Sequence, residues 1–460
     1  MASLALSDRK IRKPVDAGII AICLSFLLGA LLLFRPEAHG VDPIAYYSWL
    51  RAAVIEHTLD VGSTWQHYYN EPLSREPDFT MKTATGYSYN HWAAGPAILW
   101  SPLYLMAHLF VLADNASGGS MPADGYSFPY LFAASISTVL YALLGVILLY
   151  RIAMRYFQPA IAAGSAIVVV FATPLVFYTF SNPLMSHALD AFAGIVYVFA
   201  WLRARDKPGA GRRMAVGMAI GLAMWIRVQN ALLVAVPALE VLSALLEHGN
   251  LRQRFKELLK RGVPLGIGLA LLVVPLMAFW KVMYGAWIVN TYSASQGTFI
   301  NLASPHLLEV LFSSNRGLFT WSPVLLPAVA GTIPLWRIDR RLTLLLIAGF
   351  LLNYYLVASL SFWSGGAAFG ARFFINSTAY FGLGLAAAAD WLHRRVSLRA
   401  MTIAGGVFVC WNLLLLVQYA LNWVPHGGDV DLLMMAKNQF LVIPANLQRV
   451  INILISRSAH

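Results

Sequence analysis

The sequence is poor in charged residues. Only 12% of its 460 residues are charged, about half the share that is usual in soluble domains, whereas 59% are hydrophobic. A soluble core of this length could not bury so much apolar surface, but a lipid bilayer can surround the apolar faces of helices. The composition therefore argues against a soluble protein and indicates an all-α chain that crosses a membrane many times.

Cysteine is also scarce. Cys23 and Cys410 each lie inside an apolar run, so neither a disulfide framework nor a thiolate metal site is expected. Basic residues outnumber acidic ones, giving a net charge of +12, which in a soluble protein would indicate a nucleic-acid partner. Here the basic residues form short clusters between apolar runs, so membrane orientation explains them better and no nucleic-acid partner is expected.

About eleven apolar runs are near the ~20 residues that a transmembrane helix needs. The first, 15–34, has the basic flank of a signal peptide but no convincing small-residue cleavage site after it, so we expect an uncleaved anchor. Ten further spans are predicted within 128–420, at about 128–150, 159–179, 186–202, 213–226, 231–247, 262–280, 318–336, 342–361, 373–391 and 400–420.

Basic clusters before the first span and after every second later one hold 22 of the 33 lysines and arginines. Because cytoplasmic loops attract such an excess, an amino terminus in the cytoplasm puts all six clusters on the cytoplasmic side. One apolar stretch, 93–112, does not fit, because it contains two prolines and the loop after it has no lysine or arginine. We expect 93–112 to be an interfacial helix within a large first periplasmic loop, 35–127. The tail, 421–460, is expected to lie at the same interface, and 1–460 to form one module.

Charges at the membrane boundary are costly and need a reason. Arg227 lies with Gln229 and Asn230 between two spans that no real loop separates. Its guanidinium can snorkel toward water from a helix end, or it can bind an anionic head group. Arg372 ends a glycine-rich segment, 363–372, whose backbone could approach a phosphate closely.

Two acids stand in similar positions. Asp42 follows the first span and precedes Pro43, a spacing typical of a helix N-cap followed by proline, so capping and catalysis are both open. Tyr46 continues that helix as part of an aromatic strip, which could be an interface belt or a sugar platform. Asp190 starts the fourth span, one turn after His187. A metal ligand, a proton relay and a hydrogen-bonded core residue are all open for it.

No Walker loop, dinucleotide fingerprint, HExxH motif or nucleophile elbow is present. The chain instead combines an Asp just beyond the first span, a large first outer loop, an acid near the start of the fourth span and a short paired fifth and sixth span. This layout resembles the GT-C superfamily of lipid-linked glycosyltransferases, whose relatives include protein O-mannosyltransferases and lipid A aminoarabinose transferases. The segments 89–108, 225–230, 314–323 and 363–374 look like blocks of a bacterial branch of that superfamily.

The resemblance implies a helical module in the bacterial inner membrane, with a cavity facing the periplasm. The donor would be a sugar on a polyprenyl phosphate, the acceptor a glycan, lipid or protein, and the anomeric carbon would be inverted. Asp42 matches the general base of the family and Asp190 its second acid. Many members carry a pair of acidic residues at this position, whereas in this sequence Pro43 follows Asp42. No cofactor is therefore certain, and a divalent metal is one option.

The chemistry assigns roles to the remaining candidates. A carboxylate can take the proton of an attacking hydroxyl, and cations can stabilise the phosphate that leaves. Arg227 and Arg372 are the leading phosphate-binding cations, followed by Lys82, Lys281 and Arg316. The residues expected to line the substrate groove are Tyr46, Tyr89, His91, Trp92 and His187.

The main alternative is a transporter or flippase of a lipid-linked or anionic substrate, with Asp190 and Arg227 along its path. No pair of halves with matching interruptions is visible, and a transporter does not need so large an outer loop. A scaffolding role is disfavoured by the boundary charges. A glycan polymerase or ligase uses similar donors but usually carries its large outer loop late in the chain.

The first test concerns topology. A reporter fused after Leu251 should read cytoplasmic, and one fused after Asn115 should read periplasmic, because the basic clusters fix the orientation. Enzymatic reporters of each compartment make the measurement. A cytoplasmic signal at Asn115 would show that 93–112 spans the membrane and would invert the later loops.

Overall fold

The computed structural model describes residues 16–69, 80–247, 250–291, 300–446 and 448. Within these ranges every named element is a helix, and β pairing is confined to two isolated bridges. Parts of three predicted segments lie outside the described residues: the amino-terminal basic cluster with residue 15, the stretch 70–79 of the predicted first loop, and the end of the predicted interfacial tail.

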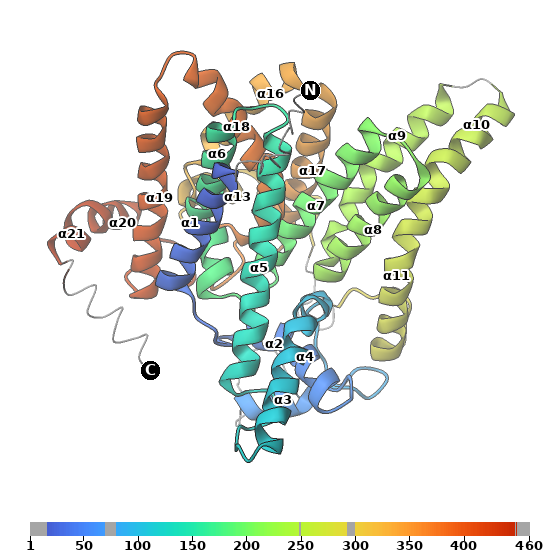
Figure 1. Cartoon of the computed structure of the whole chain (residues 1–460), viewed down its shortest axis with the longest axis vertical. Helices are drawn as coiled ribbons and strands as arrows, with labels where there is room; N and C mark the ends of the chain where they lie inside the picture. Colours follow the sequence, from blue (N-terminus) through green and yellow to red (C-terminus); the bar gives the residue numbers. More distant parts are fainter. Residues whose placement is uncertain (1–15, 70–79, 248–249, 292–299, 447, 449–460) are drawn as a thin grey trace, which may run out of the picture.

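The first half of the chain forms the centre of the molecule and one of its ends (Figure 1). α5 runs through the centre beside α1 and α6, while α2, α3 and α4 gather at its amino-terminal end. The elements are α1 (Ala17–Leu33), α2 (Val41–Ile55), α3 (Gly62–Tyr68), α4 (Gly95–Ala116), α5 (Phe128–Ala153), α6 (Pro159–Phe171), η1 (Phe177–Ser181), α7 (His187–Asp206), α8 (Ala210–Ile226) and η2 (Val228–Val234).

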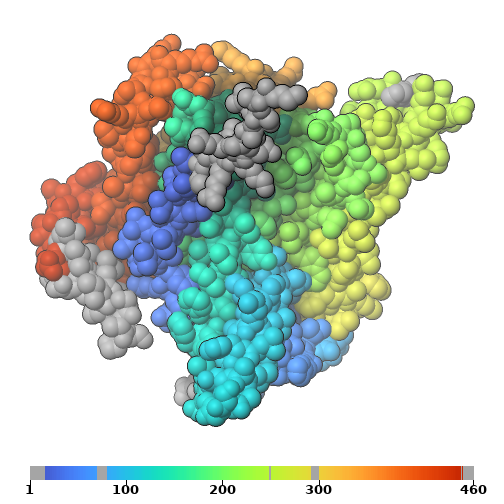
Figure 2. Space-filling view, viewed as in Figure 1, coloured from blue at the N-terminus to red at the C-terminus, as the bar shows by residue number. Residues whose placement is uncertain are grey.

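The second half flanks this centre on both sides. α9–α11 form an arm on one side, and α19–α21 lie on the other (Figures 1 and 2). The elements are α9 (Ala235–Leu246), α10 (Leu251–Glu257), η3 (Leu258–Gly262), α11 (Val263–Tyr284), α13 (Leu307–Phe312), α14 (Leu318–Trp321), α15 (Leu325–Ala330), α16 (Thr332–Ile338), α17 (Arg340–Ala358), η4 (Arg372–Ser377), α18 (Thr378–His393), α19 (Leu398–Ala420), α20 (Leu432–Lys437), η5 (Asn438–Val442) and α21 (Ile443–Ala445).

Several of these helices can cross a membrane. In the described part of the chain, six helical stretches are long and apolar enough, which makes this a multi-pass membrane protein. They are Gly95–Ala116, Phe128–Ala153, Val228–Leu246, Leu251–Tyr284, Arg340–Ala358 and Leu398–Ala420. The first of them is α4, so length and composition alone would also allow it to span. It therefore stays a prediction that 93–112 lies at the membrane interface. The number of eleven spans also stays a prediction.

Two predicted continuous spans are broken, and these predictions were wrong in detail. In 159–179, α6 ends at Phe171 and a turn around Pro174 leads into the short π-helix η1. In 318–336, three short helices, α14, α15 and α16, replace one long one. Prolines stand in both segments, and proline supplies no backbone N–H to continue a helical ladder. Apolarity alone does not reveal such breaks.

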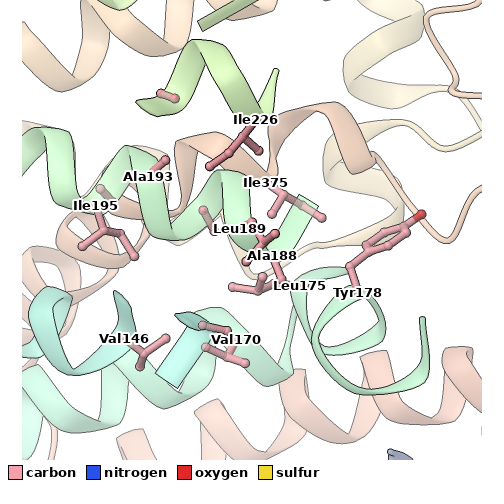
Figure 3. Packing of buried hydrophobic residues seen from close by; sticks show 14 of the residues in the cluster. Val146, Val170, Leu175, Tyr178, Ala188, Leu189, Ala193, Ile195, Ile226 and Ile375 are labelled. Carbon is pink, nitrogen blue, oxygen red and sulfur yellow. The ribbon is translucent and has the colours of Figure 1, made fainter. Parts of the chain in front are cut away.

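The buried core surrounds α7, which packs against α5 and α8 (Figure 3). Ala188, Leu189 and Ala193 of α7 are fully buried there, with Val146 of α5 and Ile226 of α8. Lipid is as apolar as a leucine side chain, so close packing of small residues stabilises such contacts more than the exclusion of water does. This packing fixes the start of α7 and the end of α8, which carry the polar residues described below.

Glycine allows α8 and α11 to pack at backbone distance. A Cβ added at Gly268 would overlap the carbonyl oxygen of Met214. We expect Gly268→Leu to lower the melting temperature of the purified protein, since overpacking typically costs about 1–3 kcal/mol. Gly266→Leu, on the same helix but facing open space, is the matched control. Equal melting temperatures for the two variants would show that the close contact contributes nothing.

Candidate active site

Asp42 lies at the start of α2, but it does not cap the helix. Gly40, whose φ of 84° favours glycine, occupies the N-cap position, and no side chain caps it. Asp42 is therefore inside the first turn, and its Oδ2 accepts a hydrogen bond from Nη1 of Arg372 at 2.7 Å. The capping interpretation of Asp42 is wrong, because its carboxylate forms an ion pair with Arg372, a residue 330 positions further along the chain.

Arg372 is held by the glycine-rich segment that precedes it. Gly365 and Gly370 have φ values of 78° and 63°, and a Cβ at Gly365 would lie 3.0 Å from Nε of Arg372. That Nε is buried and has no hydrogen-bond partner within the described structure. Since buried donors are normally satisfied, this unused N–H points to a missing acceptor at Arg372.

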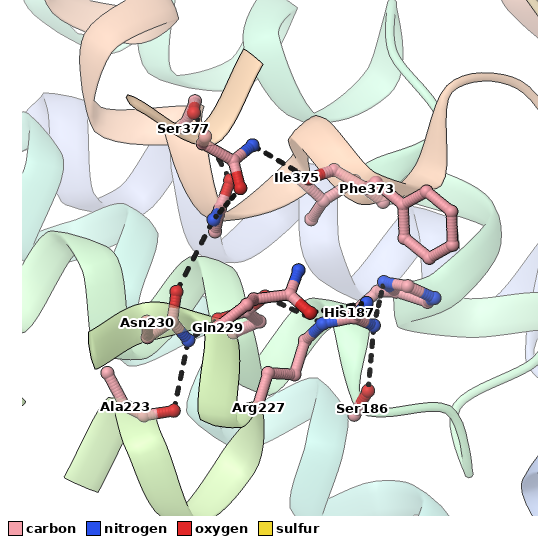
Figure 4. A network of polar contacts seen from close by, with 12 residues as sticks. Ser186, His187, Ala223, Arg227, Gln229, Asn230, Phe373, Ile375 and Ser377 are labelled. Atoms are coloured by element: carbon pink, nitrogen blue, oxygen red, sulfur yellow. Dashed lines mark hydrogen bonds and ion pairs between the residues drawn. The ribbon is translucent and has the colours of Figure 1, made fainter. Parts of the chain in front are cut away.

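Arg227 forms the second cationic centre (Figure 4). It follows the last residue of α8, and its Nη1 donates to Nδ1 of His187 at 3.2 Å and to Oγ of Ser186 at 3.4 Å. Its Nε lies 3.5 Å from Oδ2 of Asp190, and only 9% of the Arg227 side chain is exposed. A cation so deeply buried is not a snorkelling arginine, so this alternative is wrong.

Asp190 is fixed by amides as well as by Arg227. Nδ2 of Asn230 donates to Asp190 Oδ1 at 2.6 Å and to the carbonyl of Ala223 at 2.9 Å. Asn376 then bridges Asn230 to Asn353 of α17. Of the roles left open for Asp190, that of a hydrogen-bonded core residue agrees best with these contacts. The network joins α7, α8, η4 and α17.

The two cationic centres belong to one site. The guanidinium groups of Arg227 and Arg372 lie 5.2 Å and 5.4 Å from the ring centre of Phe373. Ser186, which Arg227 contacts, donates to the hydroxyl of Tyr46 at 3.0 Å. Tyr46 is one turn after Asp42 on α2. The structure thus brings Asp42, Tyr46, His187, Asp190, Arg227 and Arg372 together; their predicted roles stay predictions.

A cleft opens beside this cluster. Tyr46, His91, Trp92 and Arg227 line it, together with aromatic residues of α11 such as Tyr284. The ring of His91 stacks on Trp92 with 3.6 Å between ring centres. Burial lowers the pKa of His91 to about 4, although the charge of Asp42 opposes the shift. His91 is therefore neutral near pH 7 and adds no charge to the site.

Four predicted residues lie outside the cluster around Asp42 and Arg227. Arg316 is buried, and its guanidinium donates to the backbone carbonyls of Ala368, Pro425 and Gly428 and to the side chain of Asn315, so it ties loops together. Nζ of Lys82 donates to Ser88 and lies 3.6 Å from Asp60. Lys281 caps α11 by donating to the carbonyl of Gly285. Tyr89 donates to the carbonyl of Thr291, at the rim of the cleft.

The described residues around Asp42 do not form a metal site. Among the described residues, no three His, Cys, Asp or Glu side chains are grouped as ligands for an ion. The neighbour of Asp42 is an arginine, and a divalent cation needs several oxygen or nitrogen ligands rather than a second cation. These side chains do not fit a divalent cation at Asp42.

Sequence reasoning missed Phe373, Ser186, Tyr178, Asn353 and Asn376. Tyr178 lies 4.7 Å from the ring of His187 and accepts a hydrogen bond from the backbone of Phe369. Asn353 and Asn376 stand inside or beside predicted spans, where an amide is rare and usually bonded, so their position was a usable signal. Ser186, Phe373 and Tyr178 carried no comparable signal, because such residues are frequent in membrane helices.

The fold of this chain is similar to the folds of known structures. The chain is similar to ArnT from Cupriavidus metallidurans bound to undecaprenyl phosphate, with a TM-score of 0.55, 14% identity, and coverage of 97% of this chain and 72% of that one. It is likewise similar to ArnT from the same organism in the apo state, with a TM-score of 0.54, 13% identity, and coverage of 95% and 71%. This chain has the GT-C fold.

Neither family models nor curated protein sequences match the chain. At such low identity the GT-C assignment describes the fold, while the chemistry has to be argued from the residues themselves.

The Asp190–Arg227 pair offers a test of the site as built. Removing one partner of a buried ion pair leaves the other charge uncompensated and typically costs about 3–5 kcal/mol. We expect Arg227→Met to lower the melting temperature strongly, and Asp190→Asn combined with Arg227→Met to recover part of the loss. Arg151→Met, at a more exposed ion pair with Asp16, should change it little. A double variant that is less stable than Arg227→Met alone would contradict the pairing.

Proposed function

We propose that this protein is an inverting glycosyltransferase that moves a sugar from a polyprenyl-phosphate donor to a glycan, lipid or protein acceptor. The observation that supports this most is the cluster of Asp42, Arg372 and Arg227 beside the cleft. The GT-C fold adds support, since ArnT of the same fold is described as bound to undecaprenyl phosphate. Orientation by the basic clusters would place the site on the periplasmic side of the bacterial inner membrane, with the amino terminus in the cytoplasm.

The donor phosphate would bind between the two arginines. Arg372 uses Nη1 on Asp42 and has its buried Nε free, so one guanidinium can hold the carboxylate and a phosphate oxygen at once. Arg227 lies on the same Phe373 ring and can contact a second oxygen. Both cations would stabilise the negative charge that develops on the phosphate as the sugar leaves. Lys82, Lys281 and Arg316 are left out of this proposal.

The reaction would need one base and no acid. Asp42 takes the proton from the acceptor hydroxyl as its oxygen forms a bond to the anomeric carbon. The bond from that carbon to the phosphate oxygen breaks on the opposite side, and polyprenyl phosphate leaves as an anion with the bonding electrons. Asp190 would not touch the reacting atoms, since its contacts hold Arg227 in place.

The residues that line the cleft would contact the acceptor or the sugar. The outer surface of α4 would hold the prenyl chain. Neutral His91 stacked on Trp92 offers a flat surface with little charge, which suits the apolar face of a sugar. On α4, Met106, Leu109 and Phe110 are each more than half exposed. α4 begins against Trp225 at the end of α8, next to Arg227, so a prenyl chain that runs along α4 could leave its phosphate near the arginines.

Replacement of Asp42 tests the proposal. Asp42→Asn keeps the size of the side chain but cannot take a proton, and loss of base catalysis typically lowers rates by ~10²–10⁴-fold. Transfer should be measured with a panel of undecaprenyl-phosphate sugars, and binding with undecaprenyl phosphate itself. Binding should persist, because both arginines remain. Asp60→Asn, in the same predicted loop, is the matched control and should leave transfer unchanged.

Transfer by Asp42→Asn within a few-fold of the wild type would remove Asp42 from the mechanism and direct attention to Asp190. Loss of undecaprenyl phosphate binding in Arg372→Gln and Arg227→Gln, with the protein still folded, is the expected companion result. Unchanged binding in both variants would rule out the phosphate site.

A further inference from the structure

A larger cavity lies at the other end of the helices that carry the site. Its volume is about 740 Å³, and it is bordered by the end of α7, the start of α8, α9, the start of α11 and the start of α17. Arg227 follows the opposite end of α8, and the 17 residues of that helix put about 25 Å between the two ends. The cavity is thus separate from the cluster around Asp42.

The cavity combines an apolar floor with a basic rim. Val216, Val236, Leu265, Leu345 and Ala348 are among its apolar lining residues. Its charged lining residues are five basic ones, Arg205, Arg213, Lys260, Arg261 and Arg341, and two acidic ones, Glu240 and Glu247. The rim is therefore positive overall, although it is not free of acids.

The basic residues differ in how they are used. Arg205 is paired with Asp339 at 2.8 Å, and Arg261 with Glu257 at 2.5 Å. The side chains of Arg213 and Arg341 make no hydrogen bond or ion pair with any described residue. Arg213 has the like charge of Arg261 nearby, and the acids Glu240 and Glu257 are weaker electrostatic neighbours. Two guanidinium groups without an ion-pair partner at one cavity can together bind an anion that carries at least one full negative charge.

We propose that this cavity binds an anionic phospholipid, with the phosphate between Arg213 and Arg341 and an acyl chain along the apolar floor. A soluble phosphate would match the rim but not the floor, whereas a lipid matches both. Leu239 and Leu344 line the cavity and are 62% and 47% exposed, so the apolar lining continues to the outer surface of the helices. Basic pockets between membrane helices on the cytoplasmic side suit such head groups.

The predicted orientation decides only which leaflet of the membrane supplies the lipid. The proposed site itself rests on the cavity and its arginines. The cavity lies at the end of α7, α8 and α17 where three basic clusters stand, which the positive-inside pattern assigns to the cytoplasm. The arm of α9–α11 that forms one wall stands away from the body of the molecule in Figure 2. A lipid held here would fill the space between the arm and α17.

Lipid binding to the purified full-length protein tests the proposal. Native mass spectrometry should show tighter binding of phosphatidylglycerol and cardiolipin than of phosphatidylethanolamine. Arg213→Gln with Arg341→Gln should weaken phosphatidylglycerol binding about thirtyfold, because each basic contact near an anionic lipid contributes roughly a factor of five. Arg337→Gln with Arg399→Gln, the same charge change outside the cavity, is the matched control and should bind normally.

Equal weakening in both double variants, or none in the first, would overturn the proposal. Competition by glycerol 3-phosphate or inorganic phosphate at concentrations near those of the lipid would overturn it in favour of a soluble anion. A second measurement avoids the arginines in case their variant does not fold. A photoreactive residue replacing Leu344 should cross-link to phosphatidylglycerol, and one replacing Leu351, exposed on the same helix but outside the cavity, should do so much less. Equal cross-linking at the two positions would again contradict a defined site.

Discussion

The site depends on the need of each buried cation for a nearby anion. Charges are expensive at low dielectric unless they are paired and hydrogen-bonded. Arg372 takes Asp42 from the start of α2, and Arg227 takes Asp190 from the start of α7. Because the partners come from segments far apart in the sequence, these two pairs draw the first loop, the core helix α7 and the glycine-rich segment to one place. Phe373, which lies under both guanidinium groups, keeps the pairs side by side.

The same pairing makes the site nearly neutral, which suits the proposed binding and later release of a phosphate anion. Two arginines without acids would hold a phosphate too tightly and would be costly to bury. Two acids without arginines would repel it. The pairs also differ in a useful way. Asp190 is fixed by Asn230 as well as by its arginine, whereas Asp42 accepts a hydrogen bond from Arg372. The carboxylate with fewer fixed bonds is the better placed of the two to accept a proton.

Sequence reasoning found the acids and arginines of the site because charge is rare in such a chain, so each boundary charge needs a reason. It ranked Arg316 behind Arg372 but kept both as phosphate-binding candidates, since both lie in or after glycine-containing loops. The difference lies in tertiary contacts: Arg316 is saturated by backbone carbonyls from two other loops, and Arg372 keeps a free donor. Hydropathy likewise found the apolar segments but not the breaks at Pro174 and in 318–336, because a chain can stay apolar where its hydrogen-bond ladder stops.

α8 shows how one helix can use cations in two ways. At its carboxyl end, Arg227 is fixed by Asp190, His187 and Ser186, so its direction is set before any ligand arrives. At its amino end, Arg213 lines the cavity. The charges of Arg261, Glu240 and Glu257 act on its side chain, but none of them forms an ion pair with it. A fixed guanidinium is suited to catalysis, where misplacement slows the reaction. An unfixed one is suited to a lipid head group, which varies in position and need only be retained. The contrast in hydrogen bonding, rather than the residue type, is what separates the two proposed roles at the ends of α8.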